Sequence, residues 1–427
     1  MKRVVTILLM TVLLLSAHVA AQAPATQLKA EVTWWSFPNF LTVDGIPGKH
    51  EQSIIKAFNA KYPNIKVNIE MIDFASGPEK IVTAIQGGTA PDVLFDAPGR
   101  IIDYGKNGVL ANLNDMFTAE FIKDVNNKNV IDACKVGSNF YMYPISTAPF
   151  LMAFNKDMLQ KHGLLHMLPT EGDRTWTTSQ YTALLKALKA KNERGAIVFC
   201  ISQGGDQGTR AFMANLFNSS ITDAAVTKYT INDSNGVKGL QYVVDAIKDG
   251  LLLNGSASDG TGAIDEFCAQ RVSHTILFSP GLQAVKQHMT NFEPIMAPYP
   301  SENGTPALEY LIDGFCVLNN GDANRIKAAK LLIDFICNDP VWGPKNVVAT
   351  NTFPVRSSFG NLYKGDGTMT FLAGLTKYYA PYYNTINGFA AMRTAWFPAL
   401  QAAFSGEKTA KKALDDFVKA ANESIKR

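Results

Sequence analysis

The sequence has few residues of the kinds that carry out metal or covalent chemistry. Its 427 residues include five cysteines and six histidines, with no C-x-x-C pair and no histidine pair near a cysteine. Zinc sites usually show such spacing, so we expect no metal site. The H-E-x-x-H motif is absent as well, because Ile54 stands where a second histidine would follow His50 and Glu51.

Motifs of nucleophilic catalysis and of cofactor binding are also missing. No serine lies in a G-x-S-x-G elbow. The glycine-rich stretch at 202–210, SQGGDQGTR, lacks the Gly-Lys-Ser/Thr ending of a phosphate-binding loop and does not fit G-x-G-x-x-G. We therefore expect no cofactor and favour a binding protein over an enzyme. A glycoside-acting enzyme, which needs two placed carboxylates, is the weaker alternative.

Charge of one sign is not in excess. Lys and Arg number 40 against 37 Asp and Glu, so the net charge is +3. This balance gives no reason to expect nucleic acid or an acidic surface as a partner.

Long apolar runs are absent beyond the N-terminus. Lys2 and Arg3 precede an apolar run at 4–15, and small residues follow at 19–21, which is the pattern of a secretory signal peptide over 1–21. The run is too short for a membrane-spanning helix, which needs about 20 apolar residues. No cysteine stands at the expected cleavage point, so we predict a periplasmic protein without a lipid anchor.

The scattered cysteines suggest burial more than cross-linking. Cys200, Cys316 and Cys337 lie in apolar runs, where thiols behave as small hydrophobic groups. The odd count leaves at least one cysteine unpaired, and one disulfide remains possible.

The N-terminal part alternates strand and helix patterns. Strands are expected at 31–35, 65–69 and 92–95, with helices at 54–58 and 76–86 between them. This βαβαβ order predicts helices packed on a parallel sheet, whose ligands bind beyond the carboxyl ends of the strands. The loops at 36–39 and 96–100 should therefore open on one cleft.

The stretch at 143–158, YPISTAPFLMAFNKDM, reads as a crossover between two lobes. Its apolar run at 148–154 fits one buried strand, and Asn155 can cap the short helix that follows. The polar residues just before the run include Ser146 and Thr147, which could meet a small polar ligand. A hinge and a binding edge would then coincide.

This stretch resembles the crossover of the solute-binding proteins of ABC importers, specifically the family-1, maltose-binding-like group. Three further stretches are similar to that family in the same order: 90–113, 275–281 and 350–358. The resemblance implies an α/β, two-lobed periplasmic binding protein fold of type II, with hinged lobes and a central ligand cleft. It also implies a monomer that delivers its ligand to a membrane permease.

The predicted first lobe spans 28–146 and 299–350, and the second spans 147–298 and 351–427. Chain crossings, and so hinges, are expected near Ser146, Pro298 and Thr352.

The predicted ligand contacts lie on loops at strand ends, at the crossover, and in an aromatic-rich segment near the C-terminus. They are Trp35, Ser36, Phe37, Asn39, Asp96, Ala97, Arg100, Ser146, Thr147, Gln203, Asp206, Gln207, Phe278, Ser279, Asp313, Gly314, Asn387, Phe389 and Arg393. Several of these residues could instead have a purely structural role. Asp96 and Arg100 could form a surface ion pair, 202–210 could be an ordinary turn, and the aromatic residues could belong to the core.

Carbohydrate is the leading ligand class, because aromatic rings suit the faces of a pyranose and polar side chains suit its hydroxyls. Receptors of the same fold for polyamines, phosphate esters or ferric ion are the rivals. Polyamines would need several free carboxylates, and ferric ion would need tyrosine oxygens. The candidates for iron are Tyr378, Tyr379, Tyr382 and Tyr383. A structural or adhesive role is a further alternative.

Overall fold

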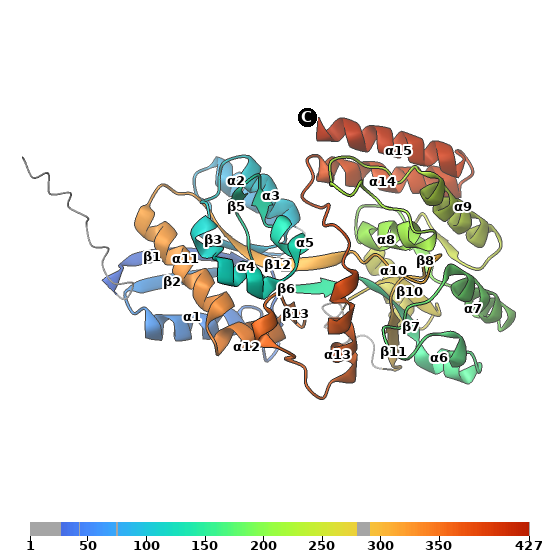
Figure 1. Ribbon diagram of the computed structural model, residues 1–427, viewed down its shortest axis with the longest axis horizontal. Coiled ribbons are helices and arrows are strands. Elements are labelled where there is room, and N and C mark those ends of the chain that lie inside the picture. Colours follow the sequence, from blue (N-terminus) through green and yellow to red (C-terminus); the bar gives the residue numbers. More distant parts are fainter. Residues whose placement is uncertain (1–26, 42, 74–75, 280–290, 427) are drawn as a thin grey trace, which may run out of the picture.

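The computed structural model describes residues 27–41, 43–73, 76–279 and 291–426. Two lobes lie side by side along the long axis of the molecule (Figure 1). The predicted signal peptide at 1–21 lies outside the described residues, and so do Pro280 and Gly281 of the predicted turn after residue 279.

The first lobe is built on a six-stranded sheet with the order β13-β6-β12-β3-β1-β2. Its strands are β1 (Ala30–Ser36), β2 (Ile65–Met71), β3 (Val93–Asp96), β6 (Tyr143–Pro149), β12 (Tyr310–Val317) and β13 (Phe353–Pro354). Strand β1 pairs in parallel with β2 and β3, whereas β12 is antiparallel to β3 and β6. The predicted βαβαβ order is therefore confirmed.

Helices cover this sheet on both faces, as burial of its strands requires. They are α1 (Lys49–Lys61), α2 (Gly77–Gln86), α3 (Pro98–Lys106), α4 (Ala119–Val125), α5 (Lys128–Asp132), α11 (Ala323–Asn338) and α12 (Trp342–Ala349). A small hairpin of β4 (Lys135–Val136) and β5 (Asn139–Phe140) completes the lobe.

The second lobe has a three-stranded antiparallel sheet, β10-β7-β11, and a parallel pair, β8 and β9. These strands are β7 (Leu151–Asn155), β8 (Ile197–Phe199), β9 (Leu253–Gly255), β10 (His274–Phe278) and β11 (Pro294–Ala297). The helices are α6 (Lys156–Lys161), α7 (Thr178–Ala190), α8 (Asp206–Leu216), α9 (Ser234–Lys248), α10 (Gly260–Cys268), α13 (Gly367–Gly374), α14 (Phe389–Phe404) and α15 (Ala410–Ile425). Figure 1 shows α14 and α15 packed together in red at the edge of this lobe.

The chain first crosses from the first lobe to the second where the sequence predicted it, but the local structure of this crossing is different. The expected single strand at 148–154 is two strands, β6 and β7, separated by Phe150. Strand β6 pairs within the first-lobe sheet and β7 within the second-lobe sheet. The side chain of Asn155 accepts a hydrogen bond from the backbone N–H of Met158, which confirms the predicted cap of α6.

The return crossing comes later than the predicted position near Pro298. The indole N–H of Trp176 donates to the Pro298 carbonyl over 2.8 Å, and the Tyr299 hydroxyl donates to the Ile276 carbonyl over 2.9 Å. These bonds hold that segment in the second lobe. The chain returns through β12 instead, and β13 then pairs with β6 near the predicted third crossing at Thr352.

The cysteines do not pair in this structure. All five are free, and four of them are buried: Cys134, Cys200, Cys316 and Cys337. Within the described ranges, no helix is long and apolar enough to cross a membrane.

Candidate functional site: the interlobe residues

On the first-lobe side, the end of β3 presents an ion pair. Asp96 is the last residue of β3 and is 1% exposed. One of its carboxylate oxygens accepts from Arg100 Nε over 2.6 Å, and the other accepts from the Ala97 backbone N–H over 2.7 Å. The Arg100 guanidinium lies over the buried Phe37 ring, 5.0 Å from its centroid, and its side chain is 35% exposed. Arg100 is thus anchored but still reaches solvent.

Strand β12 brings a second carboxyl group next to this pair. Gly314 pairs with Asp96 across the strands, so Asp313 lies close to the same point. The buried Asp313 accepts a hydrogen bond from Ser146 Oγ over 3.3 Å. Burial raises the pKa of Asp313 to about 7, and the negative charge of Asp96 adds to the effect. A side chain at Gly314 would collide with the Tyr143 carbonyl oxygen, 2.6 Å from the Cβ position, so glycine is required there.

On the second-lobe side, α8 begins inside the stretch at 202–210 that was predicted as a polar turn. Gly205 ends the turn with φ of 77°, and Asp206 opens the helix. Asp206 therefore lies one helical turn before Arg210, and the two side chains form an ion pair that is 2% and 1% exposed. Arg393 of α14 approaches the same carboxylate, with Nε 3.0 Å from Asp206 Oδ2. Its Nη2 also donates to the Gln203 carbonyl over 2.6 Å.

Arg210 was not predicted as a sugar contact, and two more residues that were not predicted as such complete this network. Glu309 immediately precedes β12, and its carboxylate accepts a hydrogen bond from the Tyr383 hydroxyl. Arg210 Nε donates to the same hydroxyl oxygen over 2.6 Å, and Arg210 Nη2 lies 3.6 Å from Glu309 Oε2. Burial raises the pKa of Glu309 to about 7, although Arg210 opposes this shift. The side-chain alternation of β12, which places 309 and 313 on one face, is the sequence signal that could have identified Glu309.

The ring of Phe389 lies beside this network at the start of α14. The Arg210 and Arg393 guanidinium carbons are each 5.8 Å from its centroid, and the Tyr383 ring meets it edge to face at 6.1 Å. Phe389 is half-buried and the neighbouring Asn387 is exposed.

The two sides touch each other. A Cβ on Gly99 would lie 3.7 Å from the Phe389 ring and 3.4 Å from the Asn384 carbonyl oxygen. Lys106 Nζ donates to the Thr385 carbonyl over 2.5 Å. The two sides are therefore in direct contact at this point.

Other predicted contacts lie outside this convergence. Trp35 is partly buried beneath Lys80, whose Nζ is 4.8 Å from its ring, and the buried Ser36 donates to the Phe37 carbonyl. Phe278 is fully buried against Phe267.

The remaining predicted residues are distributed around the two lobes. Asn39 and Gln207 are half-buried, Ser279 is buried at the end of β10, and Thr147 is buried and accepts from the Tyr379 hydroxyl over 3.2 Å.

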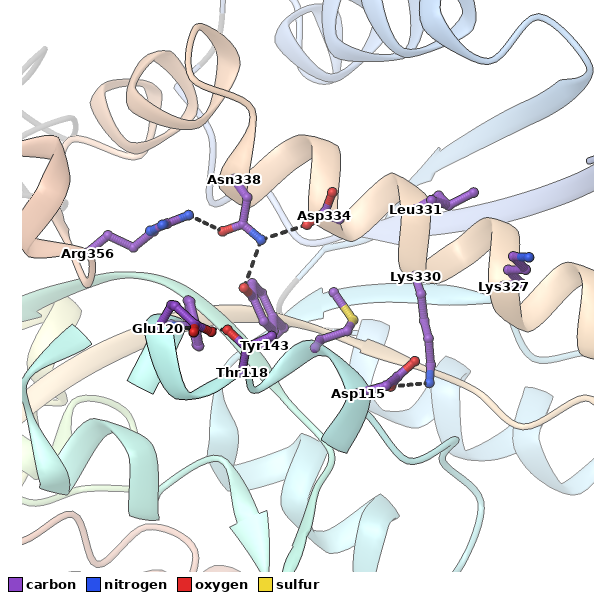
Figure 2. A pocket seen from close by; sticks show the side chains of 12 residues that line it. Asp115, Thr118, Glu120, Tyr143, Lys327, Lys330, Leu331, Asp334, Asn338 and Arg356 are labelled. Carbon is purple, nitrogen blue, oxygen red and sulfur yellow. Dashed lines mark hydrogen bonds and ion pairs between the residues drawn. The ribbon is translucent and has the colours of Figure 1, made fainter. Parts of the chain in front are cut away.

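A hollow of about 440 Å³ lies in the first lobe between α4 and α11, away from these residues. Figure 2 shows that its polar groups bond to one another. Asn338 Nδ2 donates to the Tyr143 hydroxyl and to Asp334, each over 2.8 Å, and Lys330 pairs with Asp115 at 2.6 Å. This hollow lies within the first lobe, whereas the residues described above meet between the two lobes, so we take the interlobe residues as the candidate site.

Comparison with known proteins places these features in context. The family model for bacterial extracellular solute-binding proteins matches residues 46–341. An uncharacterized lipoprotein of Streptomyces antibioticus is 22% identical over 363 residues, covering 82% of this chain and 74% of that protein. The arabinooligosaccharide-binding protein of Bacillus subtilis is 23% identical over 267 residues, covering 59% and 56%.

Solved structures share the fold over nearly the whole chain. An ABC substrate-binding protein from Listeria monocytogenes in complex with cycloalternan has a TM-score of 0.73 and 21% identity, covering 93% of this chain and 99% of that one. The cyclic alpha-maltosyl-1,6-maltose binding protein from Arthrobacter globiformis has a TM-score of 0.75 and 21% identity, with the same coverage.

Proposed function

Because the chain belongs to the family of bacterial extracellular solute-binding proteins, we propose that it is the carbohydrate receptor of an ABC importer. It would bind a mono- or oligosaccharide between its lobes and deliver it to the membrane permease, without catalysis. The observation that carries this proposal is a pair of polar clusters, Asp96 with Arg100 on one lobe and Asp206 with Arg393 and Phe389 on the other, on either side of the contact between Gly99 and Phe389. Relatives named for oligosaccharides point the same way.

The pairing of the charges favours a neutral ligand. Asp96 pairs with Arg100, and the two carboxylates Asp206 and Glu309 pair with the two guanidinium groups of Arg210 and Arg393. Paired groups still have hydrogen-bonding positions for hydroxyls, each bond being worth about 0.5 to 1.5 kcal/mol net. A polyamine would instead need free carboxylates, and a phosphate ester would need free arginines.

The tyrosines that could serve ferric ion have separate partners. The hydroxyls of Tyr378, Tyr379 and Tyr383 donate to Asp173, Thr147 and Glu309, respectively. Three hydroxyls with different partners do not form a common ligand set. We therefore rank iron below a sugar.

A thermal-shift screen tests the ligand class. The panel would contain glucose, maltose, maltotriose, arabinotriose, spermidine and ferric citrate. A ligand that binds only the folded state at 100 times its Kd stabilises it by about 2.7 kcal/mol, which raises the melting temperature measurably. We expect a shift with a sugar. A shift with spermidine or ferric citrate alone would overturn the proposal.

Export and assembly are part of the same proposal. We propose a periplasmic monomer whose signal peptide is removed after Ala21 and which carries no lipid. N-terminal sequencing of the exported protein should begin at Gln22. A lipid-modified N-terminus, as the lipoprotein relative suggests for itself, would contradict this part.

A further inference from the structure

The start of β12 is attached to the segment 378–389, here called the ligand arm because it ends at Phe389. The backbone N–H of Leu308 donates to the Tyr378 carbonyl over 2.8 Å, and the Ala380 N–H donates to the Leu308 carbonyl over 3.0 Å. The next residue in the chain, Glu309, then accepts from the Tyr383 hydroxyl. The two residues that lead into the crossing strand therefore hold the arm by the backbone of Leu308 and by the carboxylate of Glu309, whose side chain is 10% exposed.

Arg210 connects this carboxylate to the ring of Phe389. The guanidinium is 1% exposed and lies 5.6 Å from the centroid of Tyr383 and 5.8 Å from that of Phe389. Its Nε donates to the Tyr383 hydroxyl and its Nη2 faces Glu309. A planar guanidinium keeps its donors in a fixed geometry, so the groups that orient it also orient the rings it contacts.

We propose that Glu309 is a positioning residue: together with Arg210 and Tyr383 it fixes the ring of Phe389 at the interlobe site and so links the crossing strand to the ligand arm. The inference rests on the proposed function in taking Phe389 as a ligand contact. The placement of the ring can be measured without any ligand. Glu309 acts through its neighbours and need not touch the sugar.

The charge of Glu309 gives this role a measurable signature. Burial raises its pKa to about 7, so the carboxyl loses or gains its charge near neutral pH. When protonated it can still accept from Tyr383, but it no longer attracts Arg210. The titratable and charged groups around it are Asp206 and Arg210 of α8, Tyr382 and Tyr383 of the ligand arm, Arg393 of α14, and Tyr299.

The test uses fluorine NMR of the full chain, with 4-trifluoromethylphenylalanine placed at position 389. The parent protein should give one resonance that titrates with a midpoint near pH 7. Glu309→Gln has the shape of the protonated acid, so its resonance should stay near the low-pH position of the parent and should not titrate. Glu309→Leu removes both acceptor and charge, and should shift or broaden the resonance at every pH. Glu293→Gln, an exposed glutamate paired with Lys156, is the matched control and should titrate like the parent.

Two outcomes would overturn the proposal. One is a parent-like resonance and titration in Glu309→Leu. The other, which decides the matter if Glu309→Leu does not fold, is an unchanged titration in Glu309→Gln. A purely structural role would lower stability but would not give the glutamine variant the low-pH resonance of the parent.

Calorimetry connects the positioning role to binding. The sugar used is whichever of glucose, maltose, maltotriose and arabinotriose raises the melting temperature of the unlabelled parent. We expect roughly a tenfold loss of affinity in Glu309→Leu, the size of one charged hydrogen bond, and a smaller loss in Glu309→Gln. Unchanged affinity in Glu309→Leu would contradict the link to binding. If none of these sugars binds, the proposed function fails, while the fluorine spectra still decide the positioning role.

Discussion

The two sides of the interlobe site use the same residue types in different ways. On the first-lobe side, Arg100 pairs with one carboxylate and its side chain is 35% exposed. On the second-lobe side, Arg210 is 1% exposed and lies between Asp206 and Glu309. A buried cation in a closed network has a fixed position before any ligand arrives, whereas an exposed one can still adjust. The structure thus combines a rigid second-lobe surface with an adaptable first-lobe donor.

Removing the buried arginine should have the largest effect. We expect Arg210→Met to lower the free energy of unfolding by about 3 to 5 kcal/mol, because Asp206 loses a buried partner. Arg100→Met should lower it by about 1 to 3 kcal/mol, because Asp96, which is 1% exposed, loses its cation, while the Arg100 side chain itself is 35% exposed. Urea denaturation of both variants measures the difference. Equal losses would show that the two sides do not differ in the way described.

The buried acids should make stability depend on pH. Glu309 and Asp313 have ordinary pKa values of 4.5 and 3.8, and burial raises both to about 7. Between pH 4 and 7 the folded chain keeps protons that the unfolded chain has lost. The stability contributed by each group is therefore full below its unfolded pKa and is lost as pH rises through its folded pKa. We expect a loss of roughly 3 kcal/mol for Glu309 and roughly 4 kcal/mol for Asp313.

Neutral variants separate the two contributions. In Glu309→Gln and in Asp313→Asn, the free energy of unfolding should fall less steeply as pH rises. The wild type should therefore become less stable relative to each variant as pH rises. Urea unfolding at intervals from pH 4 to pH 8 gives the comparison. A difference between wild type and variant that stays constant over this range would contradict the raised pKa of that acid.

The contact between the lobes predicts a moderate effect on affinity. Lys106 of α3 donates to the Thr385 carbonyl of the ligand arm, and we expect this bond to be lost when the lobes move apart. Lys106→Met should weaken sugar binding about fivefold, since a bond of about 1 kcal/mol is lost from the closed form alone. Lys123→Met, on the first-lobe helix α4, is the control. Equal sugar affinities of the two variants in calorimetry would show that this contact does not contribute to binding.

Salt should have the smallest effect. The charges at the site are paired and the proposed ligand is neutral, so sugar affinity should change less than twofold between 50 and 500 mM sodium chloride. Screening acts over about 8 Å at physiological ionic strength and would weaken binding of a polyamine strongly. A steep salt dependence would favour a charged ligand.

The sequence predicted the parts of the fold that depend on local pattern. The alternation of strands and helices, the outward crossing and the Asn155 cap of α6 follow from residues close together in the chain. The return crossing was placed too early, because prolines at 298 and 300 suggested a linker, while the bonds to Trp176 and Ile276 join residues over 20 to 120 positions away.

The site shows the same limit. Asp96 and Arg100 lie only four positions apart in the chain, so their pairing could be predicted from the sequence. The bond between Tyr383 and Glu309 spans 74 positions and depends on how β12 meets the ligand arm. Phe278 was predicted as a ligand contact because it is the aromatic residue nearest the end of a strand. It is instead buried against Phe267, because the packing of α10 on β10 decides which side chains of that strand are buried.

The central claim is that a sugar is held between the two lobes by groups from both. Calorimetric titration of the same sugar into wild type, Arg100→Ala, Phe389→Ala and the double variant tests it most directly. We predict that Phe389→Ala weakens binding by about 0.5 to 1.5 kcal/mol beyond the area lost, that Arg100→Ala weakens it by at least as much, and that the double variant binds most weakly. Wild-type affinity in both single variants would contradict the account.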